Sequence, residues 1–243
     1  MASMTRRTFA LGAMWATPAV LASTQAPAVS ASTHNQQGID WNFGTYTETM
    51  APTPSHGDEV IAFTFVPTAC PGLTITGTTT RYLNSRGTGH NFHRENITGT
   101  YSSGLVLNYQ ANIATGYASR TEWEITFTPA VTGLQLAITD IDWDGTNPAT
   151  TLIENRENVT ITPLPATAPT LGSKMSGAGT LADPWVSVNN FQNTPNGASN
   201  VANVGLSYGA TAISSITITA WSMGLPATQQ NIFLSTLALD CPP

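Results

Sequence analysis

Apolar and polar side chains alternate with a period of two along the body of the chain. This period is typical of β-strands that have one face in a core and the other in solvent. Segments rich in Gly, Pro, Asn and Thr separate the runs, and no stretch sustains the 3.6-residue period of an amphipathic helix. The runs are VIAFTFV (60–66), LTITGT (73–78), LVLNY (105–109), TEWEITFT (121–128), LQLAITDI (134–141), NVTITP (158–163), WVSVN (185–189), VGLSY (204–208), ISSITITAW (213–221) and NIFLSTLAL (231–239).

This pattern predicts an all-β fold, an antiparallel β-sandwich of jelly-roll-like type with about ten strands. The composition agrees, because only 9% of the residues are charged while Thr, Gly, Asn and Pro are abundant. Such sequences favour strands joined by turns over long surface helices. A Pro- and Gly-rich stretch at 163–184 is a candidate boundary between subdomains. Strands resume after it, so we expect a single domain over residues 32–243.

The first 31 residues have the layout of an export signal. Arg6 and Arg7 are their only charges, and an apolar run (10–22) and an Ala- and Ser-rich segment follow. This order is typical of secretory signal peptides. The apolar run is shorter than the roughly 20 residues that cross a bilayer, which argues against a membrane anchor. We expect no transmembrane segment in the mature chain.

The sequence TRRTF at positions 5–9 resembles the twin-arginine export signal, in which a Ser or Thr, two arginines, any residue, Phe and usually Leu follow one another. Here the Leu comes one position late, at Leu11. The resemblance implies a bacterial protein that leaves the cytoplasm already folded and is secreted or held at the cell surface. Small residues suit cleavage after Ala28 or Ala31, so residues 1–31 are predicted to be the signal peptide.

The mature chain is predicted to be acidic. Loss of Arg6 and Arg7 with the signal leaves six basic residues against 14 acidic ones, a formal net charge of −8. A negative protein is repelled by nucleic acid and by anionic membrane surfaces, so neither is expected as a partner. A cell-envelope or extracellular glycan or protein is the expected partner.

Cys70 and Cys241 are the only cysteines of the chain. An exported protein with two cysteines is expected to pair them, because the compartment is oxidising. The bridge would close a loop worth about 5 kcal/mol as an upper figure in the chain-entropy model. A catalytic thiol is the alternative, but no His lies near either cysteine in the sequence to activate it.

The run LQLAITDIDWDG (134–145) changes character where it reaches three aspartates. Leu134, Leu136 and Ile138 have the same parity as Asp140, Asp142 and Asp144. One strand face cannot hold both the core and a row of carboxylates, so we expect the strand to end or bulge near Thr139.

The D-x-D-x-D-G pattern resembles the start of calcium loops, in which oxygens at alternate positions close on the cation and Gly permits the turn. It departs from the EF-hand because the twelfth position is Thr151 and no helices flank it. The alternatives are a plain acidic turn and catalytic carboxylates. The predicted Ca²⁺ ligands are Asp140, Asp142, Asp144, Glu154 and Glu157. Trp143, between two of the aspartates, is the aromatic residue most expected at a surface binding site.

A looser resemblance is to exported bacterial surface domains of adhesin-like type. In these a strand ending T-D-I-D, here residues 139–142, precedes a loop and a strand of the N-V-T-I-T kind, here 158–162. The resemblance implies a β-sandwich used in adhesion or in cell-envelope structure.

Glu122 and Glu124 share one face of the strand TEWEITFT, opposite Trp123 and Ile125. Two carboxylates roughly 7 Å apart, as the strand rise implies, can act as acid and base in glycoside hydrolysis. They can equally form the solvated face of a half-buried strand. The sequence therefore leads to an exported non-catalytic β-sandwich for adhesion, glycan binding or envelope structure, stabilised by calcium, with a secreted polysaccharide hydrolase as the alternative.

Overall fold

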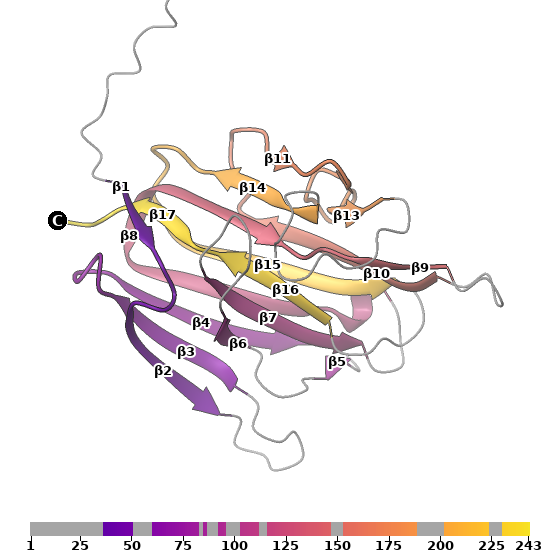
Figure 1. Ribbon diagram of the computed structural model, residues 1–243, viewed down its shortest axis with the longest axis horizontal. Coiled ribbons are helices and arrows are strands. Elements are labelled where there is room, and N and C mark those ends of the chain that lie inside the picture. The colour runs from indigo at the N-terminus through magenta and orange to yellow at the C-terminus, as the bar shows by residue number, and fades with distance from the viewer. Residues whose placement is uncertain are drawn as a thin grey trace, which may run out of the picture. The chain divides into compact units, whose positions relative to one another are not determined.

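The protein is an antiparallel all-β structure, and the predicted fold class is confirmed (Figure 1). In the part of the chain that the structure describes, helical structure is limited to 3₁₀ turns such as η2 (Tyr117–Ser119). No helix there is long and apolar enough to cross a membrane. The computed structural model describes residues 36–50, 60–82, 85–86, 92–95, 103–111, 116–146, 153–188, 202–223 and 230–243.

The strands form two layers that share one long strand, β8 (Thr121–Thr139). The first layer continues on both sides of the N-terminal half of β8, and Figure 1 shows its strands β2, β3 and β4 side by side. In hydrogen-bonded order the first layer is β2 (Gly44–Met50), β3 (Val60–Pro67), β4 (Thr74–Arg81), β8, β15 (Ile213–Met223), β10 (Ile153–Thr162) and β9 (Trp143–Thr146).

The second layer is built around the C-terminal half of β8, which pairs with β14, β16 and β17. A separate two-stranded ribbon joins β12 (Met175–Ser176) to β13 (Val186–Ser187). The other strands of the second layer are β1 (Gln36–Ile39), β5 (Ser85–Arg86), β6 (Phe92–Glu95), β7 (Gly104–Ala111), β11 (Thr170–Leu171), β14 (Val204–Ser207), β16 (Gln230–Ser235) and β17 (Leu237–Asp240).

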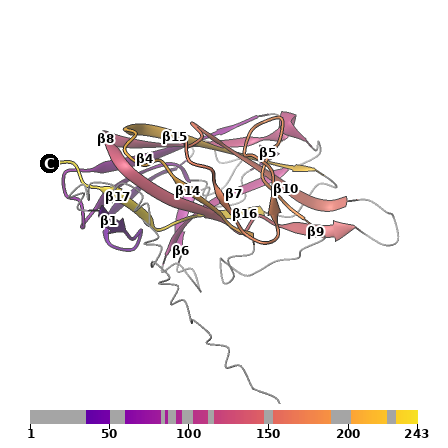
Figure 2. The same ribbon diagram turned by 90° about the horizontal axis from the view of Figure 1, so that it is seen from above.

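β8 passes from one layer to the other between its two halves, and Figure 2 shows it from above as a strongly curved strand. Gly133 lies in this passage with φ 65°, a backbone conformation that favours glycine. A Cβ atom there would lie 2.6 Å from Oδ2 of Asp240, and the Gly133 N–H donates to the carbonyl of Gly209 at 2.7 Å. The sequence run at 121–128 and most of the run at 134–141, up to Thr139, therefore belong to one strand.

The core lies between the layers and is made by the apolar positions of the alternating runs. Trp123 and Ile125 of β8 are fully buried, whereas Glu124 between them is exposed. Aromatic rings join the layers: Phe63 of β3 packs edge-on against Phe92 of β6, with ring centroids 4.9 Å apart. Burial of such rings provides the largest favourable contribution to folding.

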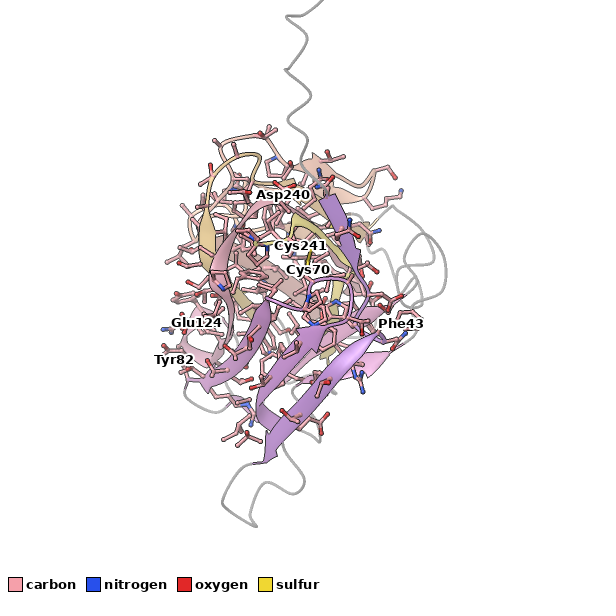
Figure 3. The ribbon with its side chains drawn as sticks, turned by 90° about the vertical axis from the view of Figure 1, so that its left-hand side faces the viewer. Phe43, Cys70, Tyr82, Glu124, Asp240 and Cys241 are labelled. Atoms are coloured by element: carbon pink, nitrogen blue, oxygen red, sulfur yellow. A yellow bond between two sulfur atoms is a disulfide. The ribbon has the colours of Figure 1, made fainter. Side chains whose placement is uncertain are left out.

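The predicted disulfide between Cys70 and Cys241 is present, with the two Cα atoms 5.5 Å apart (Figure 3). Cys70 precedes β4 of the first layer, and Cys241 follows β17 of the second. The bridge therefore ties the two layers together across 171 positions of sequence.

Candidate functional site

The acidic end of β8 has the break that the sequence predicts. β8 ends at Thr139, and Asp140 has φ 64°, a left-handed conformation that Asp tolerates better than most residues. Ile138 and Ile141, on either side of the break, are both fully buried. The turn at Asp140 thus lets the chain keep Ile141 in the core although its parity differs from that of Ile138.

Glu157 of β10 closes this turn from the neighbouring strand. Its side chain is 1% exposed, and its Oε2 accepts the backbone N–H of Asp142 at 2.7 Å. In return, the N–H of Glu157 donates to the carbonyl of Asp142 at 3.1 Å. The structure therefore places the carboxylate of Glu157 against the backbone of Asp142, and both residues are predicted calcium ligands.

Of the other predicted calcium ligands, the structure describes the side chain of Asp140 alone. Asp140 is 7% exposed at the turn itself, whereas the side chains of Asp144, Glu154 and Trp143 lie outside the described part of the chain. Among described residues, no three His, Cys, Asp or Glu side chains gather at metal-binding distance. Calcium binding at this place stays a prediction.

Glu122 and Glu124 lie on the outer face of β8, as their spacing predicts, and Figure 3 shows Glu124 and Tyr82 on the same side of the molecule. Glu122 is held from two sides. Its Oε1 accepts Nε of Arg120 at 2.7 Å, and its Oε2 accepts the hydroxyl of Tyr82 at 2.9 Å. Charge-assisted bonds to both oxygens fix the orientation of this carboxylate.

Arg120 is itself held between two aromatic rings. Its guanidinium carbon lies 3.4 Å from the ring centroid of Tyr82 and 4.4 Å from that of Tyr117. Tyr117 packs edge-on against Trp221, with ring centroids 5.1 Å apart. The hydrogen bond to Glu122 and the negative charge of Glu122 raise the pKa of Tyr82, so its hydroxyl stays a donor at neutral pH.

Tyr117 and Glu122 of this cluster line a groove of about 540 Å³ on the outer face of the first layer. The floor is formed by side chains of β10, β15 and β8, and Tyr117 forms part of the wall. The residues that line the groove are Tyr117, Glu122, Thr160, Ile161, Thr162, Leu164, Gly179, Thr180, Leu181, Thr217 and Thr219.

The opposite wall is a loop (177–185) packed on the edge of β10. Val159 and Trp185 exchange two backbone hydrogen bonds, of 3.0 and 2.9 Å. Gly179 has φ 76°, and a Cβ atom there would lie 2.3 Å from the ring of the buried Trp185. Because the loop is anchored in this way, Leu181 at its tip stays 57% exposed beside the groove.

Two threonines of the floor are almost buried yet line the groove. Thr160 is 9% exposed and Thr219 is 8% exposed. Among the described residues, neither hydroxyl has a hydrogen-bond partner. Their hydroxyl oxygens are open to the groove, so water or a ligand with hydroxyl groups can hydrogen-bond to them.

Sequence reasoning identified Glu122 but not Tyr117 and Arg120, which complete its surroundings. The signal was the segment GYASR (116–120) directly before β8, where Arg120 is two positions from Glu122 and so shares its side of an extended chain. Tyr117 is 37% exposed. Trp221, which packs against it, is 5% exposed.

Comparisons with protein-family models, with curated protein sequences and with solved structures find no match to this chain.

Proposed function

We propose that the chain is an exported, non-catalytic β-sandwich protein of the bacterial cell surface or extracellular space that binds an extracellular glycan. The groove beside Tyr117 is the binding site in this proposal. The observation that carries it is that two largely buried threonine residues, Thr160 and Thr219, present their hydroxyls on the floor of this groove.

The chemistry of the groove suits a sugar ring. A sugar offers hydroxyl groups around its edge and C–H groups on its faces. Threonine hydroxyls both donate and accept, so they match sugar hydroxyls in either sense. Tyr117, Leu164 and Leu181 provide exposed apolar surface for the C–H faces. Glu122 adds an oriented acceptor.

A polysaccharide hydrolase, the alternative prediction, requires an acid and a base that converge on one bond. Both oxygens of Glu122 already accept hydrogen bonds from Arg120 and Tyr82. Glu124 is exposed and is not part of the groove lining. These contacts favour binding over hydrolysis, and release of reducing ends from any bound polysaccharide would contradict the non-catalytic proposal.

Calcium at the acidic end of β8 is the stabilising element of the proposal. Its support is the turn at Asp140, which brings the Asp142 backbone against the carboxylate of Glu157. Carboxylate oxygens are the preferred ligands of Ca²⁺. A cation would also reduce the repulsion between these acidic groups.

Glycan binding is tested with an array of neutral, acidic and amino-containing glycans and purified cell-wall polysaccharides. We expect binding by the exported protein and a reduction of about fivefold in Thr219→Val, from one lost hydrogen bond. The matched control is Thr170→Val, an exposed threonine of β11 in the second layer. The proposal is abandoned if no glycan binds, or if both variants bind as the original does.

Export is tested separately with Arg6→Lys and Arg7→Lys combined. A twin-arginine signal depends on the guanidinium pair, so we expect the unprocessed protein to accumulate inside the cell. Unchanged secretion of this double variant would remove the twin-arginine part of the proposal.

A further inference from the structure

The groove is one end of a larger array of threonines on the outer face of the first layer. Threonines recur at alternate positions along the strands of this face, and the residues between them include core residues such as Phe63, Ile75 and Ile125. The outward threonines are Thr45, Thr47 and Thr49 of β2, Thr64 of β3, Thr74, Thr76, Thr78 and Thr80 of β4, Thr126 and Thr128 of β8, Thr217 and Thr219 of β15, and Thr160 and Thr162 of β10.

The strand register aligns these residues in rows that cross the strands. The first row starts in the groove, where Thr160 pairs with Thr219, and continues to Glu122 and Thr80. The other two rows run parallel to it. The second row is Thr162, Thr217, Glu124 and Thr78, and the third is Ser215, Thr126, Thr76, Thr64 and Thr47.

The dimensions of the array follow from sheet geometry. Neighbouring strands lie about 4.8 Å apart, so the face extends roughly 24 Å from β10 to β2. This length exceeds that of one sugar ring. From the groove, the face extends toward β2. A chain that enters the groove and follows the first row meets threonine hydroxyls on β10, β15 and β4 and the carboxylate of Glu122 on β8.

The charges on this face and on the whole chain restrict the kind of polymer that can bind here. The three rows contain no charged residue other than Glu122 and Glu124, and Arg120 pairs with Glu122. The whole chain carries a formal net charge of −6. Anionic polymers are repelled by that charge and find no basic row to bind.

We infer that the ligand is an extended neutral polysaccharide that starts in the groove and lies across the strands along the threonine rows. This inference rests on the proposed glycan-binding function and adds the length and charge class of the ligand. Threonine hydroxyls of the floor and of β4 and β3 bind successive sugar units, and the almost buried Thr160 and Thr219 fix the end of the chain.

The test uses neutral oligosaccharides of increasing length from one polysaccharide that the protein binds, with affinity measured by calorimetry. Affinity is expected to rise with length until the chain spans the face. Thr76→Val, in the third row, and Thr80→Val, in the first, are expected to reduce affinity for the long chain about threefold to tenfold and to leave the shortest chain unaffected.

Controls separate this inference from the proposed function. Valine has the shape of threonine and favours strands, so the variants keep the fold; Thr170→Val in the second layer is the matched control. Thr219→Val reduces affinity for short and long chains alike. If length and the β4 variants have no effect, or if an acidic polysaccharide binds more tightly than a neutral one, the inference is wrong while glycan binding in the groove stands. If no glycan binds at all, the proposed function fails first.

Discussion

The groove and the acidic end of β8 both hold carboxylates, but they hold them in different ways. Glu122 in the groove has a side chain 23% exposed and is bound by side-chain groups, Arg120 and Tyr82. Glu157 at the acidic end is 1% exposed and accepts a backbone N–H. The first arrangement leaves a carboxylate oriented toward solvent, whereas the second uses one to hold a turn.

The difference also concerns the backbone. The groove floor is made of regular strands, so its side chains are spaced by the strand rise and the register alone. The acidic end depends on a left-handed residue, Asp140, and on a partner from another strand. A regular surface suits a repeating ligand, and an irregular buried turn suits a structural role. The following experiments test that contrast.

The largest effect on stability is expected from loss of the disulfide, which ties together the two layers. Replacing both Cys70 and Cys241 by Ala removes the loop closure and is expected to lower the free energy of unfolding by up to about 5 kcal/mol. Denaturant unfolding at neutral pH measures this. Below the unfolding transition, glycan affinity and calcium response should both survive, and loss of one alone would show that the bridge shapes that region.

The second largest effect is expected from calcium, which should stabilise the protein through the acidic end of β8 and not through the groove. A ligand bound only by the folded state stabilises it by about 2.7 kcal/mol at a hundred times its dissociation constant. We expect calcium to raise the melting temperature and a chelator to reverse the rise. Asp142→Asn should abolish the response, whereas Glu122→Gln should keep it. A melting temperature insensitive to calcium would exclude the calcium prediction.

Removal of the buried carboxylate of Glu157 is expected to lower the free energy of unfolding by about 2 kcal/mol. Glu157→Ala leaves the Asp142 N–H without its acceptor in a buried place, and such groups cost roughly 1–3 kcal/mol. Glu124→Gln, on the solvent face of β8, is the matched control and should stay within about 0.5 kcal/mol. Comparable losses in urea for both variants would contradict the structural role of Glu157.

At alkaline pH, Tyr208 and Tyr82 should differ in how their ionisation affects the fold. Burial raises the pKa of Tyr208, whose hydroxyl donates to the carbonyl of Pro163 at 2.8 Å. Its neutral form is favoured by folding, so this stability is complete below about pH 10, the unfolded pKa, and is lost as the pH rises further. Tyr208→Phe should cost about 1 kcal/mol at neutral pH and weaken the alkaline decline.

Ultraviolet titration provides the comparison for Tyr82. Its pKa is raised by the hydrogen bond to Glu122, not mainly by burial. We therefore expect Tyr82 to ionise without unfolding, and Tyr208 only with it. Loss of the fold at the same pH in Tyr208→Phe as in the original protein would show that Tyr208 does not limit alkaline stability.

The smallest effect on stability is expected in the groove. Glu122→Gln weakens a partly exposed ion pair with Arg120, and such pairs contribute about 1 kcal/mol or less. The same variant should reduce glycan affinity, because the acceptor loses its charge and orientation. A large stability loss with unchanged affinity would reverse the roles assigned to Glu122 and Glu157.

The sequence by itself determined the fold class, the strand faces and the disulfide. Alternation in TEWEITFT placed Trp123 inside and Glu122 outside, because a strand has only two faces. Two cysteines leave a single intramolecular pairing. The same parity argument located the break at Thr139, since a core face cannot continue as a row of carboxylates.

Only the tertiary structure decided which strands lie beside one another. It showed that residues 121–139 form one strand serving both layers, and it found strands that have little apolar alternation, such as β2. It also aligned threonines from distant segments into rows and placed Tyr117 beside Glu122 through Arg120. Strand order and register arise from long-range pairing and packing of the whole core, which a local pattern of side chains does not encode.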